Sequence, residues 1–204
     1  MEQQKTGTTT IGLLCKDAVI VAAEKKATMG YMVDSKEAQK VLLLDSHIAM
    51  SIAGSVGDAQ ALMRLMRAQY KLYKLERGAI TVKAAATLLA NVLQGNKYFP
   101  YYIQLLLGGY DSEGPHIYSL DAVGGLLGTD KYYSTGSGSP FAYGSLEAGF
   151  RPDMPVDEAI SLVIKSIKVA IERDIASGGK GFTVVVINKD GARMLSDQEI
   201  KKYA

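Results

Sequence analysis

Cysteine, histidine and long apolar runs are all scarce in this chain of 204 residues. With a single cysteine, Cys15, no intramolecular disulfide can form, which is typical of a protein from a reducing compartment. No apolar run approaches the roughly 20 residues of a membrane span, and residues 1–7 are too short and too polar for a secretory signal. A net charge of only +2 gives no reason to expect nucleic acid or an anionic membrane as a partner. We therefore expect a soluble, cytoplasmic protein that binds neither.

Several common kinds of catalytic site are also excluded. The two histidines, His47 and His116, each lie beside a predicted turn, and with one cysteine they are too few for a zinc site. The motifs H-E-x-x-H and G-x-S-x-G are absent, and the glycine-rich segments at 136–139 and 178–181 lack the spacing of a phosphate-binding P-loop. We expect no metal and no cofactor, and a general base other than histidine if the protein is an enzyme.

What the chain does have is an ordinary globular composition, with 48% apolar and 22% charged residues, and clear periodicity. Helical spacing of apolar residues begins at Asp58 and returns at 82–92 and 156–173. β-Branched and apolar runs predict strands at 8–14, 18–23, 40–44, 48–53, 103–109, 116–120, 132–135 and 182–187, with a turn through Gly124, Gly125 and Gly128. The order is strands, two helices, strands, two helices and strands. It indicates an α+β fold in which two stacked sheets are covered by helices on both sides.

A candidate nucleophile lies where the first strand begins, at the junction of Gly7 and Thr8. Taken alone, Thr8 is most simply a strand residue, since β-branched side chains favour strands. At a chain terminus, however, a threonine carries its own base. An α-amino group has a pKa of about 7.7–8.0, against about 10.4 for lysine, and can take the hydroxyl proton near neutral pH. This chemistry requires the removal of the leader, so we predict a propeptide at 1–7 and a single domain at 8–204.

Four segments in a fixed order resemble one family. They are Gly7–Gly12 (GTTTIG), Ile52–Ala59 (IAGSVGDA), Ser134–Ser139 (STGSGS) and Arg173–Gly179 (RDIASGG). From Gly7 onward, over nearly its whole length, the chain resembles the β-subunits of the proteasome core particle, of the archaeal type, which are N-terminal-nucleophile (threonine) hydrolases. The resemblance implies a four-layer α-β-β-α sandwich of two antiparallel sheets flanked by helices, in agreement with the order of elements.

The resemblance also implies the residues of a catalytic site. Self-cleavage between Gly7 and Thr8 would expose Thr8, whose hydroxyl attacks a peptide carbonyl to form an acyl-enzyme. The family's buried lysine maps onto Lys40 and its acidic partner onto Glu24, where many relatives carry aspartate. The backbone N–H of Gly54 would bind the oxyanion. Support for the terminal amine maps onto Ser137, Asp174 and Ser177, and substrate-binding positions map onto Ala27, Thr28, Ala38, Ile52 and Val56. The pocket residues carry no charge, which predicts a preference for apolar residues before the cut.

The implied assembly is a seven-membered ring of β-subunits enclosed by α-subunit rings, into which an ATP-dependent unfoldase feeds unfolded polypeptide. Two other interpretations stay open: a non-catalytic structural β-subunit of the same ring, and a different amidase on the same fold. In an anonymous sequence, Lys40 and Glu24 are ordinary surface charges, and Ser137, Asp174 and Ser177 are ordinary turn and cap residues. Their joint occurrence in the family's order favours the threonine endopeptidase.

Overall fold

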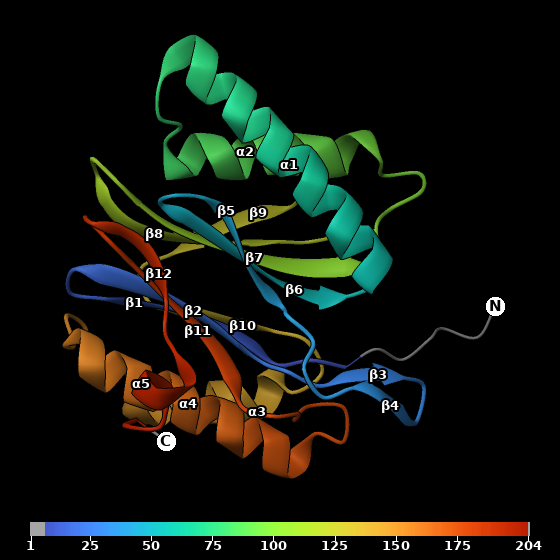
Figure 1. Cartoon of the computed structure of the whole chain (residues 1–204), viewed down its shortest axis with the longest axis vertical. Helices are drawn as coiled ribbons and strands as arrows, with labels where there is room; N and C mark the ends of the chain where they lie inside the picture. Colours follow the sequence, from blue (N-terminus) through green and yellow to red (C-terminus); the bar gives the residue numbers. More distant parts are fainter. Residues whose placement is uncertain (1–6, 204) are drawn as a thin grey trace.

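Two five-stranded antiparallel sheets lie at the centre of the computed structural model, which describes residues 7–203 (Figure 1). The first sheet contains, from edge to edge, β10 (Tyr132–Thr135), β1 (Thr10–Cys15), β2 (Ala18–Glu24), β11 (Phe182–Asn188) and β12 (Gly191–Met194). The second contains β5 (Val41–Asp45), β6 (Ile48–Gly54), β7 (Ile103–Asp111), β8 (Gly114–Leu120) and β9 (Leu126–Thr129). A separate hairpin is formed by β3 (Ala27–Met29) and β4 (Met32–Ser35).

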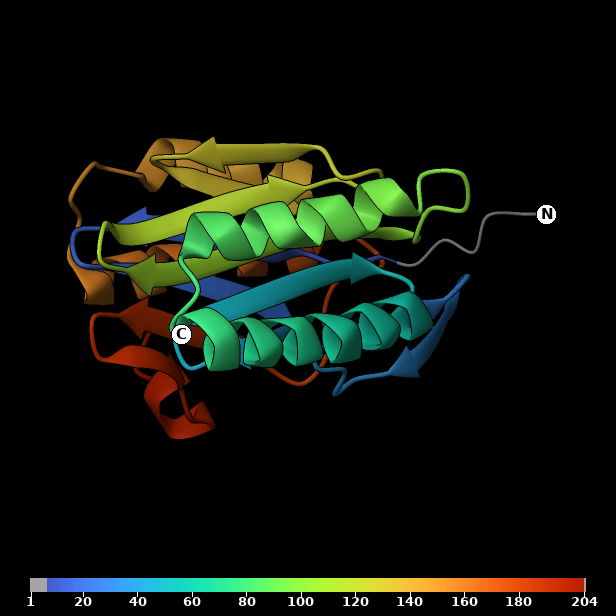
Figure 2. The same cartoon turned by 90° about the horizontal axis from the view of Figure 1, so that it is seen from above.

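Helices cover the outer face of each sheet. The second sheet is covered by α1 (Val56–Arg77) and α2 (Val82–Gly95), and the first by α3 (Ser139–Gly149), α4 (Val156–Arg173) and the short α5 (Asp197–Ile200) (Figure 1). Seen from above, α1 and α2 lie next to each other and run in nearly the same direction as the strands (Figure 2). The result is a four-layer α-β-β-α sandwich, so the fold class predicted from the sequence is confirmed.

The core explains why some strands read as continuous apolar runs. Strand β2 lies in the middle of the first sheet and is buried along its whole length. Its side chains alternate: Ile20 and Ala22 pack toward the helices, whereas Val19 and Val21 pack between the two sheets. A strand that is covered on both faces needs apolar residues at every position, and its sequence therefore does not alternate.

The antiparallel pairing brings the ends of several strands to the same end of the sandwich. The start of β1 lies beside the ends of β2 and β10, because Thr10 pairs with both Ala23 and Thr135. In the other sheet the start of β5 lies beside the end of β6, with Val41 opposite Ser51. The segments that enter and leave these strands therefore meet at this end of the sandwich, where the candidate site lies.

The structure corrects several predicted bounds. The first strand begins at Thr10 rather than Thr8, because its pairing with both neighbours begins there. The sequence predicts a turn at Gly128, but this residue lies in β9 and pairs with Tyr118. A Cβ there would lie 3.2 Å from the Tyr118 ring, so the glycine permits close strand packing. The bounds of α3 escaped prediction because only Ala142 and Leu146 of that helix are buried, too few for a periodic pattern.

Candidate active site

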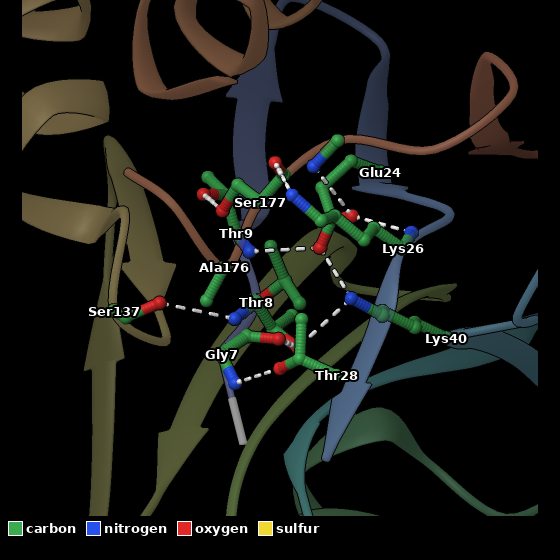
Figure 3. Close-up of polar contacts among 12 residues, drawn as sticks. Gly7, Thr8, Thr9, Glu24, Lys26, Thr28, Lys40, Ser137, Ala176 and Ser177 are labelled. Atoms are coloured by element: carbon green, nitrogen blue, oxygen red, sulfur yellow. Dashed lines mark hydrogen bonds and ion pairs between the residues drawn. The ribbon is translucent and has the colours of Figure 1, made fainter. Parts of the chain in front are cut away.

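Thr8 lies in the segment that enters β1, and its side chain faces Lys40, which directly precedes β5 (Figure 3). Thr8 is only 4% exposed, and the Nζ of Lys40 lies 2.9 Å from its Oγ1. Lys40 Nζ also forms a buried ion pair with Oε1 of Glu24, the last residue of β2. A hydroxyl, an amine and a carboxylate from three separate segments of the chain are thereby in direct contact.

Glu24 is fully buried, and backbone N–H groups hold its carboxylate in addition to Lys40. The amide of Thr9 donates to Oε1 at 3.2 Å. The amides of Lys26 and Gly178 donate to Oε2 at 2.6 and 3.0 Å. Charge-assisted hydrogen bonds of this kind offset the cost of removing a carboxylate from water. They also fix Glu24 in one orientation, facing Lys40.

Two opposing effects act on the charge of Lys40. Burial lowers the pKa of its amine because the charged form loses solvation, and the carboxylate of Glu24 raises it by attraction and by hydrogen bonding. Burial is the larger effect, so the pKa of Lys40 lies below its ordinary value. A lysine with a lowered pKa, 2.9 Å from a hydroxyl, can exchange a proton with it more readily than an exposed lysine can.

A second polar cluster surrounds Asp174, at the C-terminal end of α4. The hydroxyls of Ser137 and Ser177 each donate to Oδ2 of Asp174 at 2.6 Å, and the amide of Ala176 donates to Oδ1 at 3.3 Å. Ser137 in turn accepts the N–H of Thr8 at 3.1 Å, on the side of Thr8 away from Lys40 (Figure 3). The structure therefore brings Ser137, Asp174 and Ser177 together, and Ser137 connects this cluster to the backbone nitrogen of Thr8.

Gly54 ends β6 with a φ of +129°, in the region that favours glycine. From the sequence, we expect a glycine here because a substrate must approach the backbone closely. The structure shows a second reason within the fold itself. A Cβ at this position would lie 2.2 Å from the carbonyl oxygen of Tyr102 and 2.9 Å from the Cα of Ile103. The backbone entering β7 therefore leaves no room for a side chain.

A cavity of about 410 Å³ opens beside Thr8. Its lining includes Thr8, Lys40 and Gly54 together with all the predicted substrate-binding residues, Ala27, Thr28, Ala38, Ile52 and Val56. Sequence reasoning missed Asp34 from β4 and Gln60 and Met63 from α1, which line the same cavity. Asp34 adds a carboxylate to a lining that the sequence predicts to be uncharged. It was missed because the short, exposed hairpin that carries it has no clear strand pattern.

The peptide link before Thr8 decides the chemistry of its nitrogen. Gly7 is joined to Thr8, so this nitrogen is an amide that donates a hydrogen bond and cannot act as a base. The Thr8 hydroxyl donates to the carbonyl oxygen of Gly7 at 2.6 Å, and the N–H of Gly7 donates to Oγ1 of Thr28 at 3.3 Å. The rest of the predicted propeptide, 1–6, lies outside the described residues.

Two further residues of the site carry no signal in the sequence. The hydroxyl of Thr9 lies 2.7 Å from Oγ of Ser177, and Nζ of Lys26 donates to the carbonyl oxygens of Ile175 and Ser177 at 2.6 and 3.3 Å. Thr9 belongs to a run of threonines that is typical of a strand, and Lys26 has the sequence context of a charged residue in a turn. Their partners are far away in the sequence, so only the folded chain reveals them.

The residues that the sequence excludes from catalysis lie in other surroundings. Nε2 of His47 lies 2.8 Å from the carbonyl oxygen of Ile80, and His116 stacks on Tyr118 with ring centroids 6.4 Å apart. Cys15 is buried, which raises the pKa of its thiol to about 11. Within residues 7–203, no three His, Cys, Asp or Glu side chains are placed to hold a metal ion. None of the helices in this part of the chain combines the length and the hydropathy of a membrane span.

Two stacked antiparallel sheets between helical layers are the architecture of the N-terminal-nucleophile hydrolases. A family model described as "Proteasome subunit" matches residues 4–187, and the chain belongs to this family.

Curated relatives agree with the family match over nearly the full chain. The "Proteasome subunit beta" of Methanocaldococcus fervens is 52% identical over 198 residues, which are 96% of this chain and 88% of the relative. The protein of the same name from Methanoregula boonei is 51% identical over 203 residues, 99% of this chain and 95% of the relative. That of Methanococcus maripaludis is 48% identical over 199 residues, 97% of this chain and 90% of the relative.

Proposed function

We propose that this chain is a threonine endopeptidase subunit of a proteasome core particle, which hydrolyses peptide bonds of unfolded proteins. The observation that carries the proposal is the contact of Lys40 Nζ with Thr8 Oγ1 at 2.9 Å, in a buried site where Glu24 balances the charge of the lysine. A threonine hydroxyl is a weak nucleophile until a neighbouring group removes its proton. Lys40 donates a hydrogen bond to Oγ1, and a cation in this place makes the hydroxyl easier to deprotonate.

The proposed reaction begins with a precursor in which Gly7 is joined to Thr8. The Thr8 Oγ bonds to the carbonyl carbon of Gly7 while the C–N bond to Thr8 breaks, and the hydroxyl proton passes to the released nitrogen. Water then hydrolyses the ester, which leaves a carboxylate on Gly7 and a free α-amine and hydroxyl on Thr8. The hydrogen bonds of the Gly7 carbonyl oxygen and the Thr8 N–H support this step, because they restrain both sides of the bond to be cut.

In the processed subunit the α-amine of Thr8 becomes the base. Its ordinary pKa of about 7.7–8.0 allows it to take the hydroxyl proton near neutral pH. Oγ then bonds to the substrate carbonyl carbon, and the N–H of Gly54 donates to the oxyanion, a contribution of about 3 kcal/mol in comparable enzymes. The substrate C–N bond breaks as the proton passes to the departing amine, and water hydrolyses the acyl-enzyme. In this scheme Ser137 and Asp174 hold the amine in place.

The cavity beside Thr8 is the proposed pocket for the residue before the cut. Ala27, Ala38 and Ile52 contribute small or apolar side chains to its lining, which supports a preference for apolar residues. Thr28 and Val56 would pair with the backbone of the substrate, which binds as an added strand.

We also propose an assembly in which seven such subunits form a ring enclosed by α-subunit rings, in the cytoplasm, with an ATP-dependent unfoldase supplying unfolded polypeptide. Enclosure would keep a peptidase of low sequence specificity away from folded proteins. Exposed aromatic side chains support burial in an assembly, since Tyr31 and Phe99 are 90% and 91% exposed in the single chain.

The test compares Thr8→Ala and Thr8→Ser in the assembled particle, with a fluorogenic peptide as substrate and mass spectrometry of the subunit. We expect Thr8→Ala to lose both peptide hydrolysis and propeptide removal, because no hydroxyl remains to attack either carbonyl. Thr8→Ser keeps a hydroxyl at the same position and should retain part of both activities. Wild-type activity in Thr8→Ala, or an active wild-type subunit that still begins at Met1, would contradict the proposal. A wild-type particle with no hydrolysis would favour the non-catalytic structural subunit.

A further inference from the structure

The hydroxyl of Thr9 has a defined direction of hydrogen bonding. Thr9 is fully buried, and its Oγ1 lies 2.7 Å from Oγ of Ser177 (Figure 3). Ser177 Oγ donates its only proton to Oδ2 of Asp174 at 2.6 Å, since a carboxylate accepts and does not donate. Thr9 must therefore be the donor to Ser177.

Ser137 connects Asp174 to the backbone nitrogen of Thr8. Ser137 also donates to Oδ2 of Asp174, at 2.6 Å, so its oxygen is left to accept the N–H of Thr8 at 3.1 Å. Every proton in the series points toward Asp174, from Thr9 through Ser177 on one side and from Thr8 through Ser137 on the other. The two branches meet at Oδ2 of Asp174, so Ser177 and Ser137 share one acceptor atom.

Gly138 closes the space around the outer end of this series. A Cβ on Gly138 would lie 2.0 Å from Oγ1 of Thr9 and 3.0 Å from Oγ of Ser177. The backbone therefore lies directly against the two hydroxyls and leaves little room for water between them. Removal of the Thr9 hydroxyl would therefore take away the hydrogen bond that Ser177 accepts from it.

We infer that Thr9 is a positioning residue for the reaction proposed above: its hydroxyl orients Ser177, and through Asp174 and Ser137 it holds the nitrogen of Thr8. The inference rests on the proposed function, because the nitrogen matters only if it becomes the base. Thr9 is not part of the cavity lining, so its hydroxyl should affect the chemical step and not the binding of substrate.

Thr10 provides a matched control. It is the next residue in the chain, it is also fully buried, and its Oγ1 lies 2.7 Å from Oγ1 of Thr135. Thr10→Val therefore removes a hydroxyl-to-hydroxyl bond of the same length that is not connected to Asp174. Valine has the shape of threonine, and the amide of Thr9 that donates to Glu24 remains in Thr9→Val.

The experiment measures kcat and KM of Thr9→Val, Thr9→Ser and Thr10→Val in the assembled particle with a fluorogenic peptide. Rates are divided by the fraction of subunits that begin at residue 8, as determined by mass spectrometry. For Thr9→Val we expect kcat to fall about tenfold with KM within about twofold of wild type, the size of effect that one lost hydrogen bond produces. Thr9→Ser should recover most of kcat, and Thr10→Val should keep it.

The inference is wrong if kcat of Thr9→Val equals that of Thr10→Val, or if Thr9→Ser is as slow as Thr9→Val, which would indicate packing alone. If Thr9→Val does not assemble, Thr9→Ala takes its place, and Thr9→Ser must exceed it by about tenfold in kcat. Thr8→Ala is measured in parallel. Hydrolysis that persists in Thr8→Ala overturns the proposed function and this inference together, whereas a normal kcat in Thr9→Val beside an inactive Thr8→Ala overturns only the inference.

Discussion

Replacing Glu24 by glutamine keeps the size of the side chain and removes the charge that faces Lys40. The carboxylate is fully buried, pairs with Lys40 and accepts the amide protons of Thr9, Lys26 and Gly178. A glutamine offers one acceptor oxygen and one NH2 group, so at least one of the present donors would face another donor. The substitution therefore removes the ion pair and leaves part of the surrounding backbone unsatisfied.

The expected loss of stability follows from burial. Breaking a buried ion pair by removing one partner costs about 3–5 kcal/mol, because the remaining charge is left without compensation. Lys40 can relieve part of this cost by releasing its proton, since Glu24 is what raises its pKa against the effect of burial. We therefore expect the free energy of unfolding of Glu24→Gln to fall by about 3 kcal/mol at neutral pH, the lower end of that range.

The pH dependence has a definite sign. In the variant, the folded state releases the Lys40 proton at a lower pH than the wild-type folded state does, while the unfolded chains titrate alike. Stability rises with pH wherever the unfolded state binds more protons than the folded state. The difference in unfolding free energy between wild type and Glu24→Gln should therefore become smaller as the pH rises from the pKa of Lys40 in the folded variant toward its pKa in the folded wild type.

Glu158→Gln is the matched control for the measurement. Glu158 pairs with Arg151 at the N-terminal end of α4, where the two side chains are 50% and 66% exposed, and Asp174 lies at the opposite end of that helix. An exposed ion pair contributes about 0.2–1 kcal/mol. The assay is urea unfolding followed by circular dichroism, together with peptide hydrolysis by the assembled particle. Equal losses of stability in Glu24→Gln and Glu158→Gln, or normal hydrolysis by Glu24→Gln, would refute the reasoning.

Three further predictions concern stability. Burial raises the thiol pKa of Cys15 from 9.0 to about 11. The neutral thiol therefore contributes its full share to the free energy of unfolding below about pH 9, and this share is lost as the pH rises toward 11. Cys15→Ala should show a flatter unfolding free energy over that interval, and an identical slope would contradict the assignment. Gly54→Ala should cost at least about 1–3 kcal/mol, because alanine would take a positive φ and meet a backbone carbonyl at 2.2 Å. Gly144→Ala, with open space around it in α3, should instead stabilise by about 0.5–1 kcal/mol in the same urea titration.

The fold could be predicted well where one segment carries its own pattern. The strands at 18–23 and 182–187 are apolar except at Thr183, because helices bury one face of the first sheet and the second sheet buries the other. The helix at 156–173 was predicted with the bounds that α4 has. Prediction failed where the pattern is weak. Strands β3 and β4 are short and mostly exposed, and α3 buries too few side chains to show a period.

The candidate site likewise contains residues that could be predicted from the sequence and residues that could not. Thr8 was named from the chemistry of a terminal threonine, and Lys40 and Glu24 were named from the family resemblance. The structure brings the three into contact. Thr9 and Asp34 were not named, because a buried threonine and a strand aspartate have no local feature that separates them from their neighbours. Their place in the site depends on hydrogen bonds and cavity walls contributed by distant segments.

The amino-acid sequence by itself indicated the family and the layered α+β architecture and named the candidate catalytic side chains, since periodicity and short motifs are properties of consecutive residues. Only the tertiary structure decided how those side chains are held. Antiparallel pairing brings the starts of β1 and β5 and the ends of β2 and β6 to one end of the sandwich, and there the direction of each proton is set by which acceptor lies within reach. Contacts between segments far apart in the chain are not encoded at any single position, and the orientation of Asp174 and its serines could be obtained in no other way.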